Sequence, residues 1–109
     1  MIHDCAITCG RGALTDGGGG ASGWVVLLDL PLTVRPRRML ADKFPVEFEP
    51  SHGGRIGLLP RDALSDAGDR SAAGAATVWI DVEACVVLHT VNAHERPDGR
   101  VVLTALRSV

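Results

Sequence analysis

Aromatic side chains are scarce in this sequence: they make up 4% of its 109 residues, and there is no tyrosine. Proteins that bind single-stranded nucleic acid without sequence preference usually stack the bases on aromatic rings. The formal net charge of −2 at pH 7 is also too small to attract a polyanion over any distance. These two shortages predict a protein that does not bind nucleic acid.

The sequence also lacks a run of about 18 apolar residues, which is the length that a membrane-spanning helix needs. Its first residues, MIHDCAIT, carry a charge and do not resemble a signal peptide. The three cysteines, Cys5, Cys9 and Cys85, form an odd set, which favours free thiols in a reducing compartment. We therefore expect a cytoplasmic protein.

Strand-forming residues dominate what the sequence does contain. Runs rich in β-branched and aliphatic side chains, bounded by turn residues, are typical of short strands. They cover residues 24–34, 54–60, 76–82, 85–93 and 100–109. The last two runs flank the turn sequence HERPDG and predict a β-hairpin. Together with the run before it, this hairpin predicts a three-stranded antiparallel meander.

Three other segments carry no strand signal. Residues 9–23 are rich in glycine but lack the G-K-[ST] ending of a phosphate-binding loop, so they predict a flexible connector. Residues 61–76 are small and polar, and they predict a surface loop rather than a helical turn. Acidic residues closely follow the basic cluster of Arg35, Arg37 and Arg38. This cluster predicts a solvated loop, with a membrane-surface contact as the alternative.

Two histidines lie in segments that otherwise predict buried strands. Both faces of the strand around His89 are largely apolar, so its imidazole is either a core group bonded to a backbone carbonyl or a metal ligand. His3 precedes Asp4, which could orient its ring, although successive strand residues point to opposite faces. A solvent-exposed terminal histidine is the alternative. His52 and His94 lie in or beside turns, and we expect both to be exposed.

The cysteines offer a second metal hypothesis. Cys5 and Cys9 have a C-x3-C spacing, and with His3 and His89 they could form a zinc set. A zinc finger or ribbon normally shows two such close pairs, and this sequence has one. A small zinc-binding module therefore stays the weakest of the hypotheses.

The order of several stretches resembles the carotenoid cleavage oxygenase family, which includes retinal-pigment-epithelium-type isomerases and bacterial lignostilbene dioxygenases. The stretches are MIHDCAIT, LDLPLTV, FPVEFEPSHGGRIGLLPR, VLHTVNAHE and GRVVLTALR. The H-D-x-x-I-T and H-x-x-N-A-x-E patterns within them are fairly specific. The resemblance covers residues 3–8 and about 25–109, and it spans only part of a family member's length. It departs from the family at residues 9–23, where an atypical glycine-rich insertion stands.

The resemblance implies an all-β fold. Family members are seven-bladed β-propellers with antiparallel meander blades, so residues 1–109 are expected to form part of one such domain. Four histidines from inner strands of the propeller hold one non-haem Fe(II). His3 and His89 match two of these ligands, and the other two would lie before Met1 and after Val109. Glu95 matches the motif's glutamate, for which we expect a structural role.

The chemistry implied by the resemblance is cleavage of a conjugated C=C bond with O2, which gives two carbonyl products. Neutral imidazole suits Fe(II) and leaves coordination positions open. The substrate would be a carotenoid or apocarotenoid, with a stilbene-like phenol as the alternative. A peripheral membrane contact of the full-length protein is also expected. A second hypothesis is a non-catalytic fragment or degraded gene product of the family, and we expect the isolated chain to be inactive.

Overall fold

The structure is a computed structural model that describes residues 4–10, 23–64 and 70–108. Its strands are β1 (Cys5–Ile7), β2 (Trp24–Asp29), β3 (Leu32–Val34), β4 (Val46–Phe48), β5 (Gly54–Pro60), β6 (Val78–Val82), β7 (Val86–Glu95) and β8 (Val101–Ser108). Its helices are the 3₁₀ turns η1 (Pro36–Ala41), η2 (Pro50–His52) and η3 (Arg61–Leu64), and the α-helix α1 (Arg70–Ala76). No helix in the described ranges is long and apolar enough to span a bilayer. The dominance of strands confirms the predicted all-β character, and most of the glycine-rich segment, residues 11–22, lies outside the described residues.

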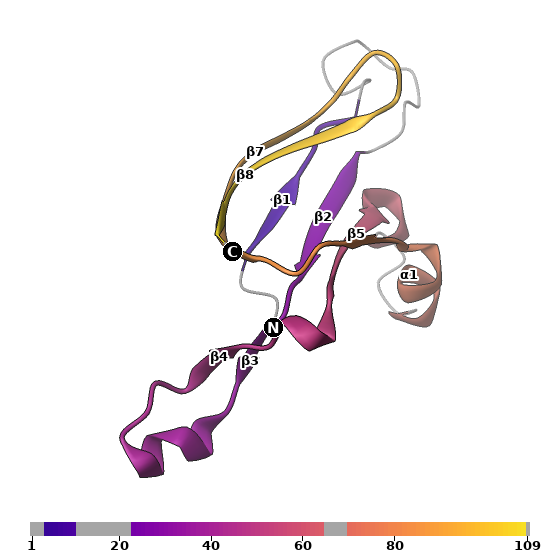
Figure 1. Cartoon of the computed structure of the whole chain (residues 1–109). Coiled ribbons are helices and arrows are strands. Elements are labelled where there is room, and N and C mark those ends of the chain that lie inside the picture. Colours follow the sequence, from indigo (N-terminus) through magenta and orange to yellow (C-terminus); the bar gives the residue numbers. More distant parts are fainter. Residues whose placement is uncertain (1–3, 11–22, 65–69, 109) are drawn as a thin grey trace.

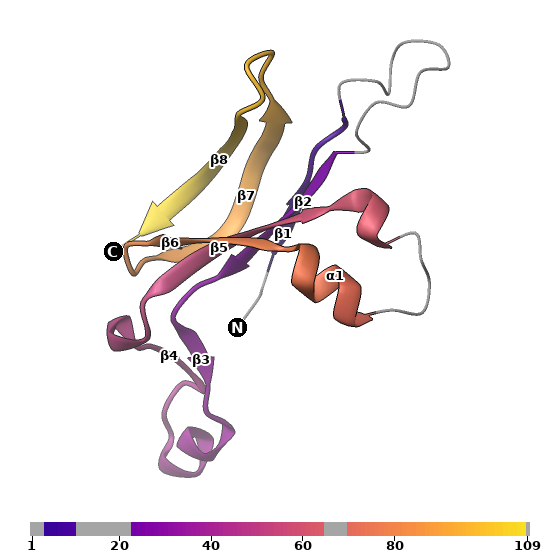
Figure 2. The same ribbon diagram turned by 90° about the vertical axis from the view of Figure 1, so that its right-hand side faces the viewer.

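The strands form three antiparallel sheets. One is four-stranded in the order β1-β2-β5-β6, and the other two are the hairpins β3–β4 and β7–β8. Both views show the β3–β4 hairpin projecting from one end of the molecule, away from the turn that joins β7 to β8 (Figure 1; Figure 2). The chain is accordingly elongated, with principal extents of 58 × 31 × 20 Å.

The predicted strand at 24–34 divides at Pro31 into β2 and β3. Proline has no N–H to donate to a ladder, and here its carbonyl accepts a hydrogen bond from the Glu49 N–H at 2.9 Å. That bond leads into β4, which the sequence did not predict and which pairs with β3 from Leu32↔Phe48 to Val34↔Val46. The result is a separate hairpin instead of a longer strand.

The predicted meander is wrong in its first pairing. The hairpin β7–β8 forms as expected, with Gly99 at φ +84° in its turn. However, β6 pairs with β5, in a register that aligns Ile80 with Ile56, and β6 does not pair with β7. The chain leaves the sheet after β6 because Cys85 is buried against Leu28 and Leu30 on the face of the sheet. Burial of this apolar cluster therefore directs β7 across the face of the sheet instead of along its edge.

The predicted surface loop at 61–76 is also wrong in part, because it contains η3 and α1. Alanine has the highest helix propensity of all residues, and α1 has the alanine-rich sequence RSAAGAA. The Thr77 hydroxyl donates to the Ala73 carbonyl at 2.9 Å at the end of this helix. The helix propensity of the alanines thus outweighs the presence of Gly74 within this helix.

Candidate functional site: the seam between the two histidine motifs

The two predicted histidine motifs meet along β1 and β7. β1 follows the first motif's histidine and pairs with β2 from Cys5↔Leu27 to Ile7↔Val25, so it forms one edge of the four-stranded sheet. β7 carries the second motif and contacts β1 although it belongs to a different sheet. Four polar residues of the two motifs bridge the contact, and we call them the motif seam. They are Asp4, Thr8, Thr90 and Glu95.

The first bridge of the motif seam is the Asp4 carboxylate. Its Oδ2 accepts from the backbone N–H of Thr90 at 2.7 Å and from the Thr90 hydroxyl at 3.0 Å. Its Oδ1 accepts from the N–H of Cys5 at 2.8 Å. These bonds, led by the Thr90 backbone bond, lower the pKa of Asp4 below its ordinary value of 3.8 against a small opposing effect of burial. The charge of His89 lowers the pKa of Asp4 in the same direction and is the last of the causes.

The second bridge lies at the far end of β1. Thr8 is completely buried, with 0% of its surface exposed. Its hydroxyl donates to Glu95 Oε1 at 2.6 Å and accepts from the Trp24 N–H at 2.8 Å, and its own N–H donates to the Trp24 carbonyl at 2.9 Å. The Thr8 carbonyl accepts from the Arg61 guanidinium at 3.4 Å. Every polar group of this buried threonine is therefore satisfied, as a stable interior requires.

Of the two predicted metal ligands, the structure describes only His89. His3 lies outside the described residues. His89 lies on β7 immediately before Thr90, and its side chain is exposed. The prediction that its strand is buried on both faces is wrong, because Leu88 and Val91 are also exposed and the β7–β8 pairing shifts register on both sides of Thr90. In a two-stranded hairpin with such irregularities, strict alternation of buried and exposed residues is lost.

Of the groups at and beside the motif seam, the His89 imidazole is better suited to bind a metal ion than the Asp4 carboxylate. Asp4 already accepts three hydrogen bonds, and the His89 side chain is exposed on β7. Across residues 4–10, 23–64 and 70–108, no three histidine, cysteine or acidic side chains converge on one point. The free thiols of Cys5 and Cys9 are exposed, so these residues give no support to the zinc hypothesis.

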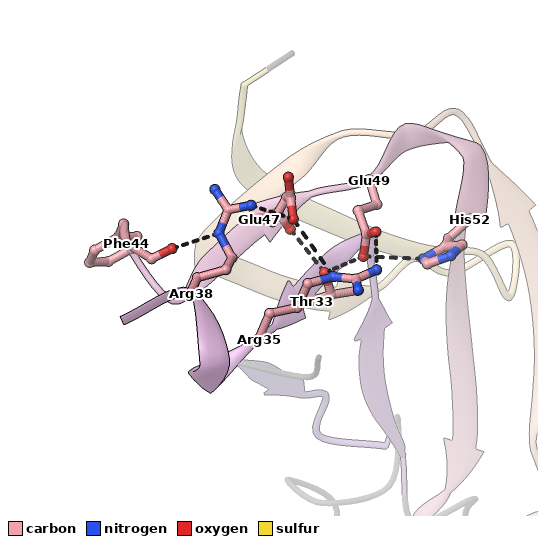
Figure 3. A network of polar contacts seen from close by, with 7 residues as sticks. All are labelled: Thr33, Arg35, Arg38, Phe44, Glu47, Glu49 and His52. Carbon is pink, nitrogen blue, oxygen red and sulfur yellow. Dashed lines mark hydrogen bonds and ion pairs between the residues drawn. The ribbon is translucent and has the colours of Figure 1, made fainter. Parts of the chain in front are cut away.

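A second polar cluster, which we call the hairpin network, lies on the β3–β4 hairpin. Its members are Thr33, Arg35, Arg38, Glu47, Glu49 and His52. Figure 3 shows Glu49 between Arg35 and His52, bonded by the Thr33 hydroxyl and the Arg35 guanidinium. Arg38 pairs with Glu47 at 2.7 Å. Two arginines of the predicted solvated cluster are therefore bound to the acidic residues that follow them in the sequence, and His52 and His94 are exposed as predicted.

Sequence reasoning missed most of the motif seam. The position of Asp4 beside His3 suggested a role in orienting that ring, which lies outside the described residues, and it gave no sign that the carboxylate accepts hydrogen bonds from Thr90. Thr8 and Glu95 carried a signal only as letters of the two motifs, and Thr90 carried none. Their partners lie 86 and 87 residues apart in the sequence, so only the three-dimensional fold reveals them.

The protein is therefore an antiparallel β protein. The motif seam joins two histidine-containing motifs that are distant in the sequence. A family model described as retinal pigment epithelial membrane protein matches residues 1–108. The chain belongs to this family, which confirms the resemblance seen in the motifs. No solved structure gives a significant match.

Similar curated proteins are carotenoid cleavage enzymes of plants. The chain is 30% identical over 105 residues to a carotenoid 9,10(9′,10′)-cleavage dioxygenase 1 of Arabidopsis thaliana, a match that covers 95% of the chain and 16% of that relative. It is 28% identical over 109 residues to a chromoplastic zeaxanthin 7,8(7′,8′)-cleavage dioxygenase of Crocus sativus, covering 100% of the chain and 24% of that relative. The chain thus spans a small part of the length of these relatives.

Proposed function

We propose that the chain is part of a non-haem Fe(II) dioxygenase that cleaves a conjugated C=C bond of a carotenoid or apocarotenoid. The observation that carries the proposal is the motif seam, which brings the strand that follows His3 against the strand that holds His89. The family match and the names of the plant relatives support the same chemistry. The proposal extends to the rest of the fold, a seven-bladed propeller of which residues 1–109 form a part. Cytoplasmic location stays a prediction.

His3 and His89 are the proposed iron ligands of this chain. Bound iron would supply the centre that activates O2 beside the alkene. The exposed His89 ring would offer a nitrogen to the iron, while the Asp4 carboxylate accepts hydrogen bonds from Thr90 and Cys5. Glu95 holds the buried hydroxyl of Thr8 and so supports the strand without contacting the metal.

The proposed reaction is tested on the complete gene product with carotenoid, apocarotenoid and stilbene substrates, by chromatography of the carbonyl products. We expect cleavage of the polyenes, and loss of at least 100-fold in rate for His89→Ala, since removal of an imidazole ligand impairs the metal centre. His94→Ala is the matched control, because His94 is also exposed on β7, and it should cleave at the wild-type rate. Cleavage of stilbenes alone would favour the lignostilbene-type alternative. No cleavage at all by an iron-loaded protein would favour the non-catalytic alternative.

We also propose that η1 and the segment after it touch a membrane surface, as expected of an enzyme whose substrate dissolves in lipid. Three apolar side chains there are strongly exposed: Met39 at 62%, Leu40 at 90% and Phe44 at 75%. Exposed Arg37 and Lys43 lie next to them and outnumber the one exposed acidic residue there, Asp42, which leaves the tip with a positive charge suited to anionic lipid headgroups. The tip thus combines apolar and basic groups on the part of the molecule that projects furthest from the sheet (Figure 1).

Sedimentation with vesicles tests this contact. We expect binding to vesicles that contain phosphatidylglycerol, weaker binding to pure phosphatidylcholine, and loss of binding in Phe44→Asp. Leu106→Asp is the matched control, because Leu106 on β8 is equally exposed, at 75%, and lies far from the tip in sequence. Equal binding by Phe44→Asp and Leu106→Asp would contradict a contact through η1.

A further inference from the structure

β1 and β7 lie in different sheets, and hydrogen bonds of side chains join the segments around them. β1 pairs through its backbone with β2, and β7 pairs with β8. Among the described strands, no backbone ladder joins β1 to β7. Hydrogen bonds of the motif seam, from Asp4 to Thr90 and from Thr8 to Glu95, join the segment around β1 to β7.

The two bridges span different numbers of residues on β7 and on the segment around β1, and a bulge in β7 accounts for the difference. Asp4 and Thr8 are four residues apart, whereas Thr90 and Glu95 are five residues apart. Between Thr90 and Asn92 the pairing with β8 shifts register, since two steps along β7 correspond to one step from Ala105 to Thr104. Such a bulge places one extra residue in a strand without lengthening it in proportion. It therefore accommodates the additional residue of β7, and both bridges form at once.

The first bridge stands directly after both motif histidines. Asp4 follows His3 in the sequence and Thr90 follows His89. Because adjacent residues share a backbone, a bond that fixes Asp4 on Thr90 constrains the backbone next to each histidine. Supporting groups that orient metal ligands in this way commonly change metal affinity about 10- to 100-fold when they are removed. The second bridge stands five residues further along β7, beyond the bulge.

We propose that Asp4 is a positioning residue that sets the register of the first histidine motif on the second, through the N–H and hydroxyl of Thr90. The inference rests on the proposed function, since it gives the register a consequence for metal binding. An aspartate is required because its two oxygens accept three hydrogen bonds, from Cys5 and twice from Thr90. Asparagine has a single acceptor oxygen and would turn its NH₂ group toward one of these donors.

The test uses the complete gene product with Co(II) in place of iron, whose visible absorption reports ligand geometry. For Asp4→Asn we expect a changed spectrum and Co(II) affinity lower by about 10- to 100-fold. Thr90→Ser keeps the hydroxyl and should retain the wild-type spectrum and affinity. Thr90→Val removes only the hydroxyl and should lie between these limits, which provides a milder variant if Asp4→Asn folds poorly. Asp81→Asn, at an exposed aspartate on β6, is the control for loss of one negative charge.

Amide hydrogen exchange at Thr90 gives an independent readout of the bridge itself. We expect the Thr90 N–H to exchange faster in Asp4→Ala, which removes both acceptor oxygens, than in the wild type, whether or not metal is present. Unchanged exchange would overturn the proposal, because the bridge would not exist in solution. Faster exchange with unaltered affinity and spectrum would also overturn it, because Asp4 would then serve the fold alone. If His89→Ala binds Co(II) normally, the proposed function and the positioning role both fail, and the exchange result still shows whether the bridge forms.

Discussion

The molecule contains two polar clusters that differ in what they join. The hairpin network links residues of one hairpin, with Thr33 and Arg35 bonded to Glu49 only 16 and 14 residues away. The motif seam links residues 86 and 87 positions apart and includes a threonine with no exposed surface. Local, exposed ion pairs can form wherever a hairpin forms, whereas buried long-range bonds form only when the complete fold is in place. We therefore expect the seam to contribute more to stability than the more numerous contacts of the network.

The largest expected effect is at Thr8. Thr8→Val keeps the volume but removes the buried hydroxyl that bonds the Trp24 N–H and the Glu95 carboxylate, both of which are half-buried. Leaving such groups unsatisfied costs about 1–3 kcal/mol each, so we expect the free energy of unfolding to fall by roughly that amount or more. Urea denaturation measures it. Thr104→Val, at an exposed threonine on β8, is the control. Equal stability of the two variants would remove the distinction between seam and network.

A much smaller effect is expected for the Arg38–Glu47 pair of the hairpin network. Its side chains are 31% and 36% exposed, and exposed pairs contribute about 0.2–1 kcal/mol. A double-mutant cycle with Arg38→Ala and Glu47→Ala measures this coupling, which should shrink further in high salt. A coupling as large as the loss at Thr8 would show that the network, and not the seam, dominates.

The smallest effect concerns the pH dependence of the network. Thr33, and next Arg35, lower the pKa of Glu49 below its ordinary value of 4.5. A lowered folded-state pKa means that the stabilisation is complete above 4.5 and is lost as the pH falls through the lower folded value. An NMR titration of the Glu49 carboxyl carbon should give a midpoint below 4.5. Thr33→Val should raise that midpoint, and a midpoint that does not move would contradict the assigned cause.

Sequence reasoning was accurate where the signal was local. The runs at 54–60 and 100–109 correspond closely to β5 and β8, and the HERPDG turn forms the expected hairpin. It failed where distant residues decide the outcome. β4 is only three residues long and pairs with β3. β6 pairs with β5, which lies further back in the sequence, and not with β7. The pairing of Asp4 with Thr90 is of the same kind, since neither residue's type indicates the other.

The exposure of His89 teaches a related lesson. An apolar sequence on both faces of a strand favours two-sided burial, but among the described strands β7 pairs with β8 alone, with two register shifts. The residue type and motif identified His89 as a candidate, and they could not give its surroundings. Thr90, the next residue, is bonded to Asp4, which lies 86 positions away in the sequence.

The most direct test of the account is anaerobic Fe(II) titration of the complete gene product, with iron counted per chain in the wild type and in three single variants. We expect tight binding of one Fe(II) per chain in the wild type and in His94→Ala, and loss of that binding in both His3→Ala and His89→Ala. Full Fe(II) binding in either of the last two variants would contradict a metal centre built where the two motifs meet.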